Sequence, residues 1–98
     1  MILIEDAKRI AEKHLAAMEA GCGIAIAFNY DVTEEIESGF VFFYNTRQFW
    51  ETGDPSFTLD GNEPIFVSKI NGNVREITME QFLEYEAGNK SGRNKKTK

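Results

Sequence analysis

The sequence predicts a single α+β domain, in which an N-terminal helix and a short C-terminal helix pack on a four-stranded antiparallel meander sheet. Two observations predict this fold class. Hydrophobic residues recur every three or four positions near both ends of the domain, which is typical of amphipathic helices, and alternate with a period of two in between, which is typical of strands. The expected order is helix, two strands, a long connector, two strands and a helix, with both helices on one face of the sheet. We place this domain at residues 1–88.

The first helix is predicted for residues 3–20. Charged residues lie opposite a hydrophobic stripe, so we expect one side of the helix to be buried. Gly21 follows, and a glycine in the left-handed conformation commonly ends a helix. The stripe consists of Ile4, Ala7, Ile10, Ala11, Leu15 and Met18.

A hairpin of two strands is predicted to follow this helix. In residues 22–30 large side chains alternate with small or polar ones, which indicates a strand with one bulky face. Residues 32–39 are mostly polar and end in glycine, so we predict that they form the hairpin loop. Residues 40–45 are apolar on both faces, and a strand of that kind lies in the interior of a sheet.

A second hairpin and a short helix complete the predicted fold. Residues 64–70 and 73–78 flank Asn71-Gly72, which is the strongest short-range signal for a β-hairpin. Thr78 then begins a segment that combines capping-box spacing with a hydrophobic stripe. This segment predicts a helix that ends at Gly88.

Residues 47–64 form a connector of eighteen residues, which is long for so small a domain. Its aromatic residues allow two interpretations. If the connector folds back over the sheet, Phe49, Trp50 and Phe57 belong to the core; if it does not, Trp50 is an exposed anchor for a partner. We favour burial of Trp50, because large aromatic side chains are mostly buried.

Charge is distributed unevenly along the sequence. The formal net charge is −5, but residues 88–98 hold five of the eleven basic residues and no acid, which leaves a formal charge of −10 on residues 1–87. A field of this sign repels nucleic acid and favours a basic protein partner. Residues 89–98 are predicted to form a solvated, disordered tail, because a block of like charge without hydrophobic anchors usually does.

The sequence also predicts a cytoplasmic location. It contains no run of eighteen apolar residues that would indicate a membrane span, and no basic start followed by an apolar stretch that would indicate a secretory signal. Cys22 is the single cysteine, so a disulfide within the chain is impossible, as expected in a reducing compartment. We therefore expect no membrane partner.

The candidate chemical groups do not predict catalysis. A thiolate nucleophile needs an adjacent base, but His14 falls on the helical stripe and Cys22 on the bulky face of a predicted strand, so both are interpreted as packing residues. One His and one Cys do not complete a zinc site, and the connector lacks carboxylates at the end positions of a calcium loop. The acids Glu34, Glu35 and Glu37 lack the apolar surroundings that prepare carboxyl groups for acid–base work. We expect a binding protein without a cofactor, not an enzyme.

Residues 43–77, FYNTRQFWETGDPSFTLDGNEPIFVSKINGNVREI, resemble the central signature of the YrhB-like family of small bacterial proteins, which are classed among the immunity proteins of polymorphic toxin systems. In that family a strand leads into a Ser/Thr-Arg-x-aromatic-apolar-x-Thr-Gly-Asp segment, then a Leu-x-Gly-Asn-x-Pro step, an apolar strand and a hairpin glycine. The residues at these positions are Thr46, Arg47, Phe49, Trp50, Thr52, Gly53, Asp54, Leu59, Gly61, Asn62, Pro64 and Gly72.

The resemblance implies a cytoplasmic immunity protein that binds and neutralises a cognate bacterial toxin without catalysis. An alternative of another class is a chaperone-like holdase that protects proteins under heat stress, because some members of the family resemble chaperones. A third hypothesis is a small thiol enzyme that uses Cys22 and His14. For toxin binding, the contact residues expected from loop position, charge and aromatic character are Glu34, Glu35, Glu37, Phe49, Trp50, Asp54, Asp60 and Glu63.

Overall fold

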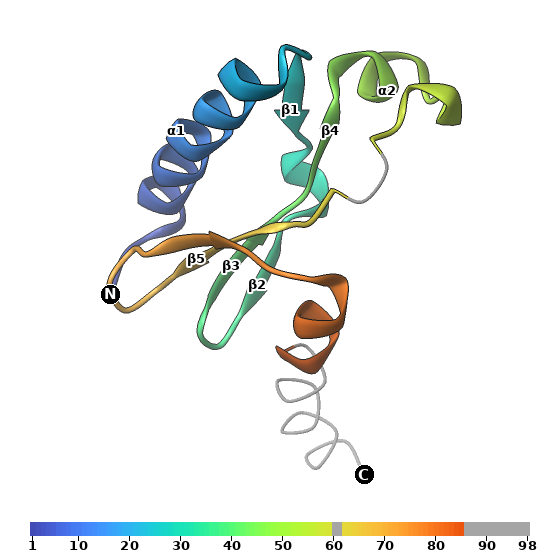
Figure 1. Ribbon diagram of the computed structural model, residues 1–98. Helices are drawn as coiled ribbons and strands as arrows, with labels where there is room; N and C mark the ends of the chain where they lie inside the picture. Colours follow the sequence, from blue (N-terminus) through green and yellow to red (C-terminus); the bar gives the residue numbers. More distant parts are fainter. Residues whose placement is uncertain (60–61, 86–98) are drawn as a thin grey trace, which may run out of the picture.

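The computed structural model describes residues 1–59 and 62–85, and these residues confirm an α+β fold (Figure 1). The predicted tail at residues 89–98 and the predicted end of the domain at residue 88 lie outside them. No helix within the described residues has the length and hydrophobicity needed to cross a membrane. The elements are α1 (Ile4–Cys22), β1 (Ile26–Phe28), the 3-10 helix η1 (Tyr30–Val32), β2 (Glu34–Ile36), β3 (Gly39–Phe42), β4 (Tyr44–Thr46), α2 (Arg47–Thr52), the 3-10 helix η2 (Pro55–Phe57), β5 (Ile65–Ser68), β6 (Val74–Glu76) and a final helix described over residues 79–85.

A four-stranded antiparallel sheet with the order β2-β3-β5-β6 forms the middle of the molecule. Its strands follow one another as a meander, and Phe40 of β3 lies opposite Val67 of β5. β1 and β4 pair separately as a two-stranded antiparallel sheet, in which Ala27 lies opposite Asn45. Because only Phe43 separates β3 from β4, the small sheet extends from one end of the large one (Figure 1).

The predicted strand at residues 22–30 is wrong in its boundaries. α1 continues into this range, and only β1 within it is a strand. The helix ends at Gly23 instead of Gly21. Gly23 takes the left-handed conformation, with φ at 73°, and its backbone N–H donates to the carbonyl oxygen of Glu19.

The predicted hairpin loop at residues 32–39 is also wrong, because it contains β2. Glu34 and Glu35 are exposed while Ile36 is buried, so one apolar side chain anchors this strand. β2 lies at the edge of the sheet, where charged side chains can remain in water. The polar composition that predicts a loop is here the composition of an edge strand.

The second predicted hairpin and the start of the last helix are confirmed. β5 and β6 flank Asn71-Gly72 and pair in an antiparallel arrangement. Thr78 and Gln81 form a capping box, in which each side chain accepts a hydrogen bond at 3.0 Å from the backbone N–H of the other residue.

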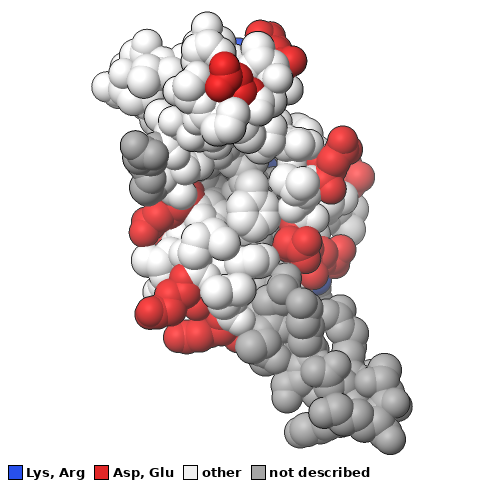
Figure 2. Space-filling view, turned by 90° about the vertical axis from the view of Figure 1, so that its right-hand side faces the viewer, with Lys and Arg blue, Asp and Glu red and all other residues white. Residues whose placement is uncertain are grey.

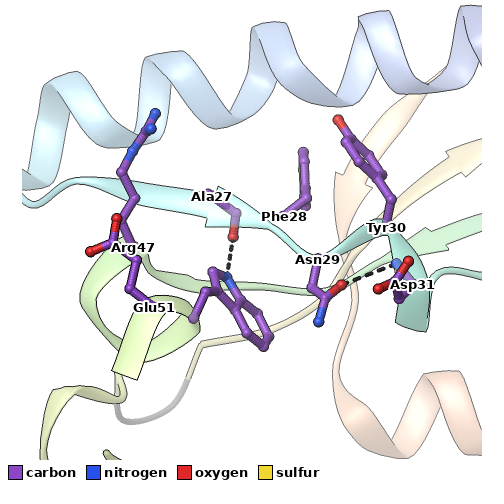
Figure 3. Close-up of a pocket in the computed structure, with 8 residues that line it drawn as sticks. Ala27, Phe28, Asn29, Tyr30, Asp31, Arg47 and Glu51 are labelled. Atoms are coloured by element: carbon purple, nitrogen blue, oxygen red, sulfur yellow. Dashed lines mark hydrogen bonds between the residues drawn. The ribbon is translucent and has the colours of Figure 1, made fainter. Parts of the chain in front are cut away.

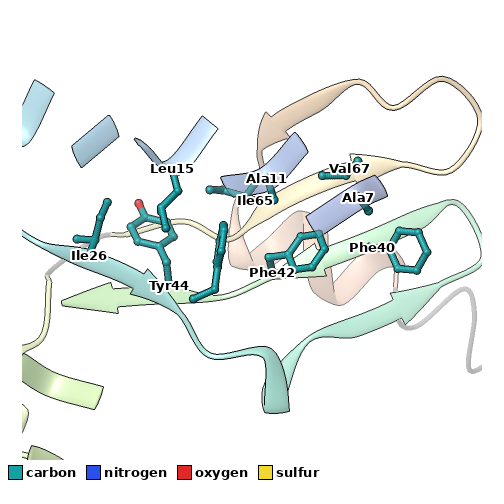
Figure 4. Close-up of a cluster of buried hydrophobic side chains, with 10 residues drawn as sticks. Ala7, Ala11, Leu15, Ile26, Phe40, Phe42, Tyr44, Ile65 and Val67 are labelled. Carbon is teal, nitrogen blue, oxygen red and sulfur yellow. The ribbon is translucent and has the colours of Figure 1, made fainter. Parts of the chain in front are cut away.

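Both faces of the four-stranded sheet are covered, so the prediction that both helices lie on one face is wrong. Phe40 and Phe42 of β3 pack with α1, whereas Val41 between them packs with the helix at residues 79–85. The prediction of an interior strand is confirmed, because β3 lies between β2 and β5. Each fully buried Val, Ile or Phe contributes about 1.5–3 kcal/mol. The α1 side contains Ala7, Ala11, Leu15, Ile26, Phe28, Phe40, Phe42, Tyr44, Ile65 and Val67 (Figure 4), and the other side contains Ile36, Val41, Phe66, Ile77 and Phe82.

Gly39 lies where β3 approaches β5 closely, and replacing it with alanine is expected to destabilise the fold. An added Cβ atom would lie 2.3 Å from the carbonyl oxygen of Val67 and 2.8 Å from the ring of Phe66. Because backbone and a packed ring must both shift, we expect Gly39→Ala to lower the free energy of unfolding in urea by about 1–3 kcal/mol.

Gly21→Ala is the matched control for this variant. Nothing lies within 4 Å of its added Cβ, and alanine inside a helix is more stable than glycine by up to about 1 kcal/mol. A Gly39→Ala variant as stable as the wild type would contradict the packing of β3 against β5 described above.

Candidate functional site

The connector at residues 47–64 begins with a short helix, α2, which the sequence analysis does not predict. Thr46 is its N-cap, because the hydroxyl oxygen accepts from the backbone N–H of Phe49 at 3.0 Å. The same hydroxyl donates to the carbonyl oxygen of Phe57 at 2.7 Å and so attaches η2 to the end of β4. Gly53 ends α2 in the left-handed conformation, with φ at 72°. One buried threonine therefore holds both short helices of the connector.

Trp50 lies on α2 and is half-buried, which falls between the two interpretations that the sequence allows. Its indole Nε1–H donates to the carbonyl oxygen of Ala27 at 2.7 Å, so α2 is attached to β1 as well as to β4. The ring of Phe49 packs against it, with 5.1 Å between the ring centroids. The indole is therefore fixed in position while part of its surface stays accessible.

A hollow with a volume of about 520 Å³ opens beside Trp50, between α2 and the segment that contains β1 and η1 (Figure 3). Asn29 and Asp31 line it from one side, and Arg47 and Glu51 from the other. This volume lies within the range of protein sites that bind small molecules. The remaining lining residues are Ala27, Phe28 and Tyr30.

Hydrogen bonds fix the η1 wall of the hollow. Asn29 Oδ1 accepts from the backbone N–H of Asp31 at 3.0 Å and caps η1. The hydroxyl of Tyr30 donates to the carboxylate of Glu12 on α1. Burial, together with this carboxylate, raises the pKa of the Tyr30 hydroxyl, so it remains protonated as a donor. The wall is thus tied to α1.

The charged groups of the hollow are not balanced. Asp31 and Glu51 pair with no basic side chain in the part of the chain that the structure describes. The guanidinium of Arg47 lies 4.0 Å from the carboxylate of Glu19 and points toward α1 (Figure 3). The hollow therefore presents two carboxylates that form no ion pair within the described residues, and one guanidinium that lies near Glu19.

The structure places the predicted contact residues in two separate groups. One group lies on β2 and on the turn into β3, and the tip of that hairpin points away from α2 (Figure 1). The other group lies on α2 and at the start of η2. The first group is Glu34, Glu35 and Glu37, and the second is Phe49, Trp50 and Asp54; Glu63 is half-buried just before β5, and Asp60 lies outside the described residues.

Two of the acidic residues among them also have partners within the fold. The carboxylate of Glu35 lies 2.8 Å from Nζ of Lys69. The side chain of Asp54 caps η2, because Oδ1 accepts from the backbone N–H of Ser56 at 2.9 Å. This hydrogen bond lowers the pKa of the Asp54 carboxyl, so the residue carries its charge at neutral pH.

Acidic side chains dominate the face of the molecule that has α2 at its top (Figure 2). Asp and Glu side chains surround an uncharged centre there, and almost no Lys or Arg is visible. Several of the basic residues elsewhere in the described part of the chain are already paired with acids. These ion pairs are Arg9–Asp6, Arg47–Glu19 and Lys69–Glu35.

The geometry contradicts the thiol-enzyme hypothesis. Cys22 is exposed, contrary to its interpretation as a packing residue, and His14 lies two helical turns earlier on α1, about 12 Å along the axis. A nucleophile and its base must lie within hydrogen-bond distance, so these two residues do not form a catalytic pair. His14 is half-buried, as predicted, with Nε2 3.6 Å from Oε2 of Glu76. Among residues 1–59 and 62–85, no three His, Cys, Asp or Glu side chains form a group able to hold a metal ion.

Residues 5–87 match the family described as Immunity protein 35. The chain belongs to this family. The match includes both short helices of the connector and every residue that lines the hollow. Membership of Immunity protein 35 confirms the prediction of an immunity protein family, although the match does not identify the narrower YrhB-like family. No curated protein and no solved structure matches the chain.

Most residues of the hollow in this Immunity protein 35 member are not predicted from the sequence. The alternating pattern of residues 22–30 predicts one strand and hides the turn at Asn29, although an asparagine side chain often bonds the backbone two residues further on and starts a turn. Arg47 and Glu51 are missed because α2 is only six residues long and shows no full helical period. Trp50 is the exception, since its size alone marks it as an anchor.

We expect Thr46→Val to loosen the connector, because it removes the N-cap of α2 and the hydrogen bond to Phe57 while keeping the side-chain volume. Loss of a cap and of one neutral hydrogen bond should together lower the free energy of unfolding by about 2 kcal/mol in urea titrations. Thr58→Val is the control, because the Thr58 hydroxyl bonds only the exposed carbonyl oxygen of Pro55, and its effect should stay within about 0.5 kcal/mol. Equal stability of the two variants would contradict the role assigned to Thr46.

Proposed function

We propose that this member of the Immunity protein 35 family binds a cognate bacterial toxin and neutralises it by covering the toxin's functional surface. The observation that carries the proposal is the family match over residues 5–87. Action in the cytoplasm, binding without catalysis and a polymorphic toxin system of the YrhB-like type belong to the same proposal. The comparisons give no support to the chaperone-like alternative.

The charge distribution supports a toxin with a basic surface. Residues 1–87 carry a formal charge of −10, and one broad face shows acids with almost no visible bases (Figure 2). Complementary potentials of this kind accelerate encounter between two proteins and disfavour partners of the same sign. An acidic protein that must find one basic toxin among many proteins gains both speed and selectivity from such a face.

We place the centre of the contact on α2 and its edge on β2. Binding energy usually concentrates in a few large, partly buried side chains, and Trp50 with Phe49 is such a pair. Glu34 and Glu37 are exposed and far from this pair, so their contribution is electrostatic steering. Asp54 and Glu63 belong to the proposed contact surface as well, and Asp60 is included from its place in the connector sequence alone.

Co-expression tests the proposed function directly. Cells that produce a toxin encoded beside this gene should survive when they also produce this protein, and the two proteins should elute together on gel filtration. Two results together would refute the proposal: the toxin kills cells despite co-expression, and no toxin-like protein encoded beside this gene forms a complex with this protein.

Charge reversal and truncation should change the binding kinetics in different ways. We expect Trp50→Ala to raise the dissociation constant at least about thirtyfold, mainly through faster dissociation, as for an interface anchor. Glu34→Lys should instead slow association and weaken its dependence on salt, because an edge charge acts by steering. Surface plasmon resonance at two salt concentrations separates the two effects.

The matched control for the charge reversal is Glu5→Lys in the first turn of α1, which changes the net charge equally but lies on another element. Circular dichroism of Trp50→Ala verifies that the variant is folded. If affinity survives both Trp50→Ala and Glu34→Lys, the contact surface lies elsewhere on the protein.

A further inference from the structure

We propose that the hollow beside Trp50 receives an arginine side chain of the toxin. The inference rests on the proposed function and adds to it the chemical class of the group recognised at the centre of the contact. It comes from the balance of donors, acceptors and charges in the lining of the hollow.

Two of the donors that line the hollow already have acceptors within the protein. The indole Nε1–H of Trp50 donates to the carbonyl oxygen of Ala27, and the hydroxyl of Tyr30 donates to Glu12. The guanidinium of Arg47 points toward α1, near Glu19 (Figure 3). Trp50 and Tyr30 therefore offer a ligand no donor, and the donors left in the lining are those of Asn29 and Arg47.

The acceptors and the negative charge of the hollow, in contrast, remain available. Asp31 and Glu51 stand on opposite sides of it, and neither pairs with a base within the described residues (Figure 3). A carboxylate accepts two or more hydrogen bonds, and bonds from a charged donor are about twice as strong as neutral ones. The complementary ligand is a cation that carries several N–H donors.

The indole of Trp50 favours a guanidinium over an ammonium ion as the bound cation. Tryptophan attracts cations more strongly than the other aromatic side chains do. The indole of Trp50 is also fixed in position by its hydrogen bond to Ala27. A guanidinium is planar, less strongly hydrated than an ammonium ion, and able to stack on a ring while its edge bonds carboxylates. An arginine side chain in the hollow can thus stack on the indole while its guanidinium donates to one of the two carboxylates, Asp31 or Glu51.

The first experiment uses the full-length protein and a blocked amino acid, Nα-acetyl-arginine amide. Trp50 is the single tryptophan of the chain, so its fluorescence and its indole N–H signal in NMR spectra report on the hollow directly. We expect saturable changes in both signals with a dissociation constant on the order of 1 mM, as suits one side chain. The neutral analogue Nα-acetyl-citrulline amide should cause none, and Nα-acetyl-lysine amide should bind at least about threefold more weakly.

Isosteric removal of the two carboxylate charges tests their role without altering the packing. Asp31→Asn with Glu51→Gln should weaken binding of the arginine derivative at least about tenfold. Glu80→Gln with Glu84→Gln is the matched control: it removes the same charge from exposed positions on the helix at residues 79–85 and should leave the titration unchanged. Equal responses to the arginine and citrulline derivatives, or equal losses in the two double variants, would overturn the proposal.

The complex with the toxin separates this inference from the proposed function. Asp31→Asn with Glu51→Gln should raise the dissociation constant of the toxin at least about tenfold, while Glu80→Gln with Glu84→Gln should change it less than twofold. If both double variants bind the toxin like the wild type, the arginine site is refuted and toxin neutralisation stands. If the wild type binds no toxin, the proposed function fails, and the arginine titration still decides on the hollow.

Discussion

The structure depends on the pairing of β3 with β5, two strands that are buried on both faces. Four residue pairs join them, from Gly39 opposite Ser68 to Phe42 opposite Ile65. Side chains alternate between the two faces, so the same two strands supply a core for α1 on one side and for the last helix on the other. The close approach at Gly39 makes this possible, because a larger residue would push β3 away from β5.

The candidate site is built as an outward extension of this core. β3 continues through Phe43 into β4, and β4 ends at Thr46, which is buried and caps α2. The indole of Trp50 then reaches back to β1, so the short helix is held at both of its sides. A helix of six residues is not stable in isolation. The register of the sheet therefore determines the position of α2 and, with it, the shape of the hollow.

The parts of the fold that could be predicted are those with local signals. α1 has a hydrophobic stripe, β3 is apolar on both faces, and the second hairpin has Asn71-Gly72 at its turn. β2 could not be recognised, because only Ile36 anchors it and its pairing with β3 is what makes it a strand. The hollow could not be predicted from the sequence for a similar reason. It depends on contacts between distant residues, such as Trp50 and Ala27, which are 23 positions apart. Single residues with unusual chemistry, such as Trp50, could be selected in advance, but their surroundings could not.

The acidic edge strand β2 has a further consequence, for solubility. An open strand edge presents unpaired backbone groups to which a second copy of the chain can add, and this is a common route to aggregation. Glu34 and Glu35 are exposed along β2, and Glu37 is exposed in the turn that follows it, so two such edges brought together would repel each other. A protein that neutralises a toxin by binding it must be present at least in equal numbers. Under the proposed function, the charges on β2 would therefore keep copies of the protein from pairing edge to edge at such concentrations.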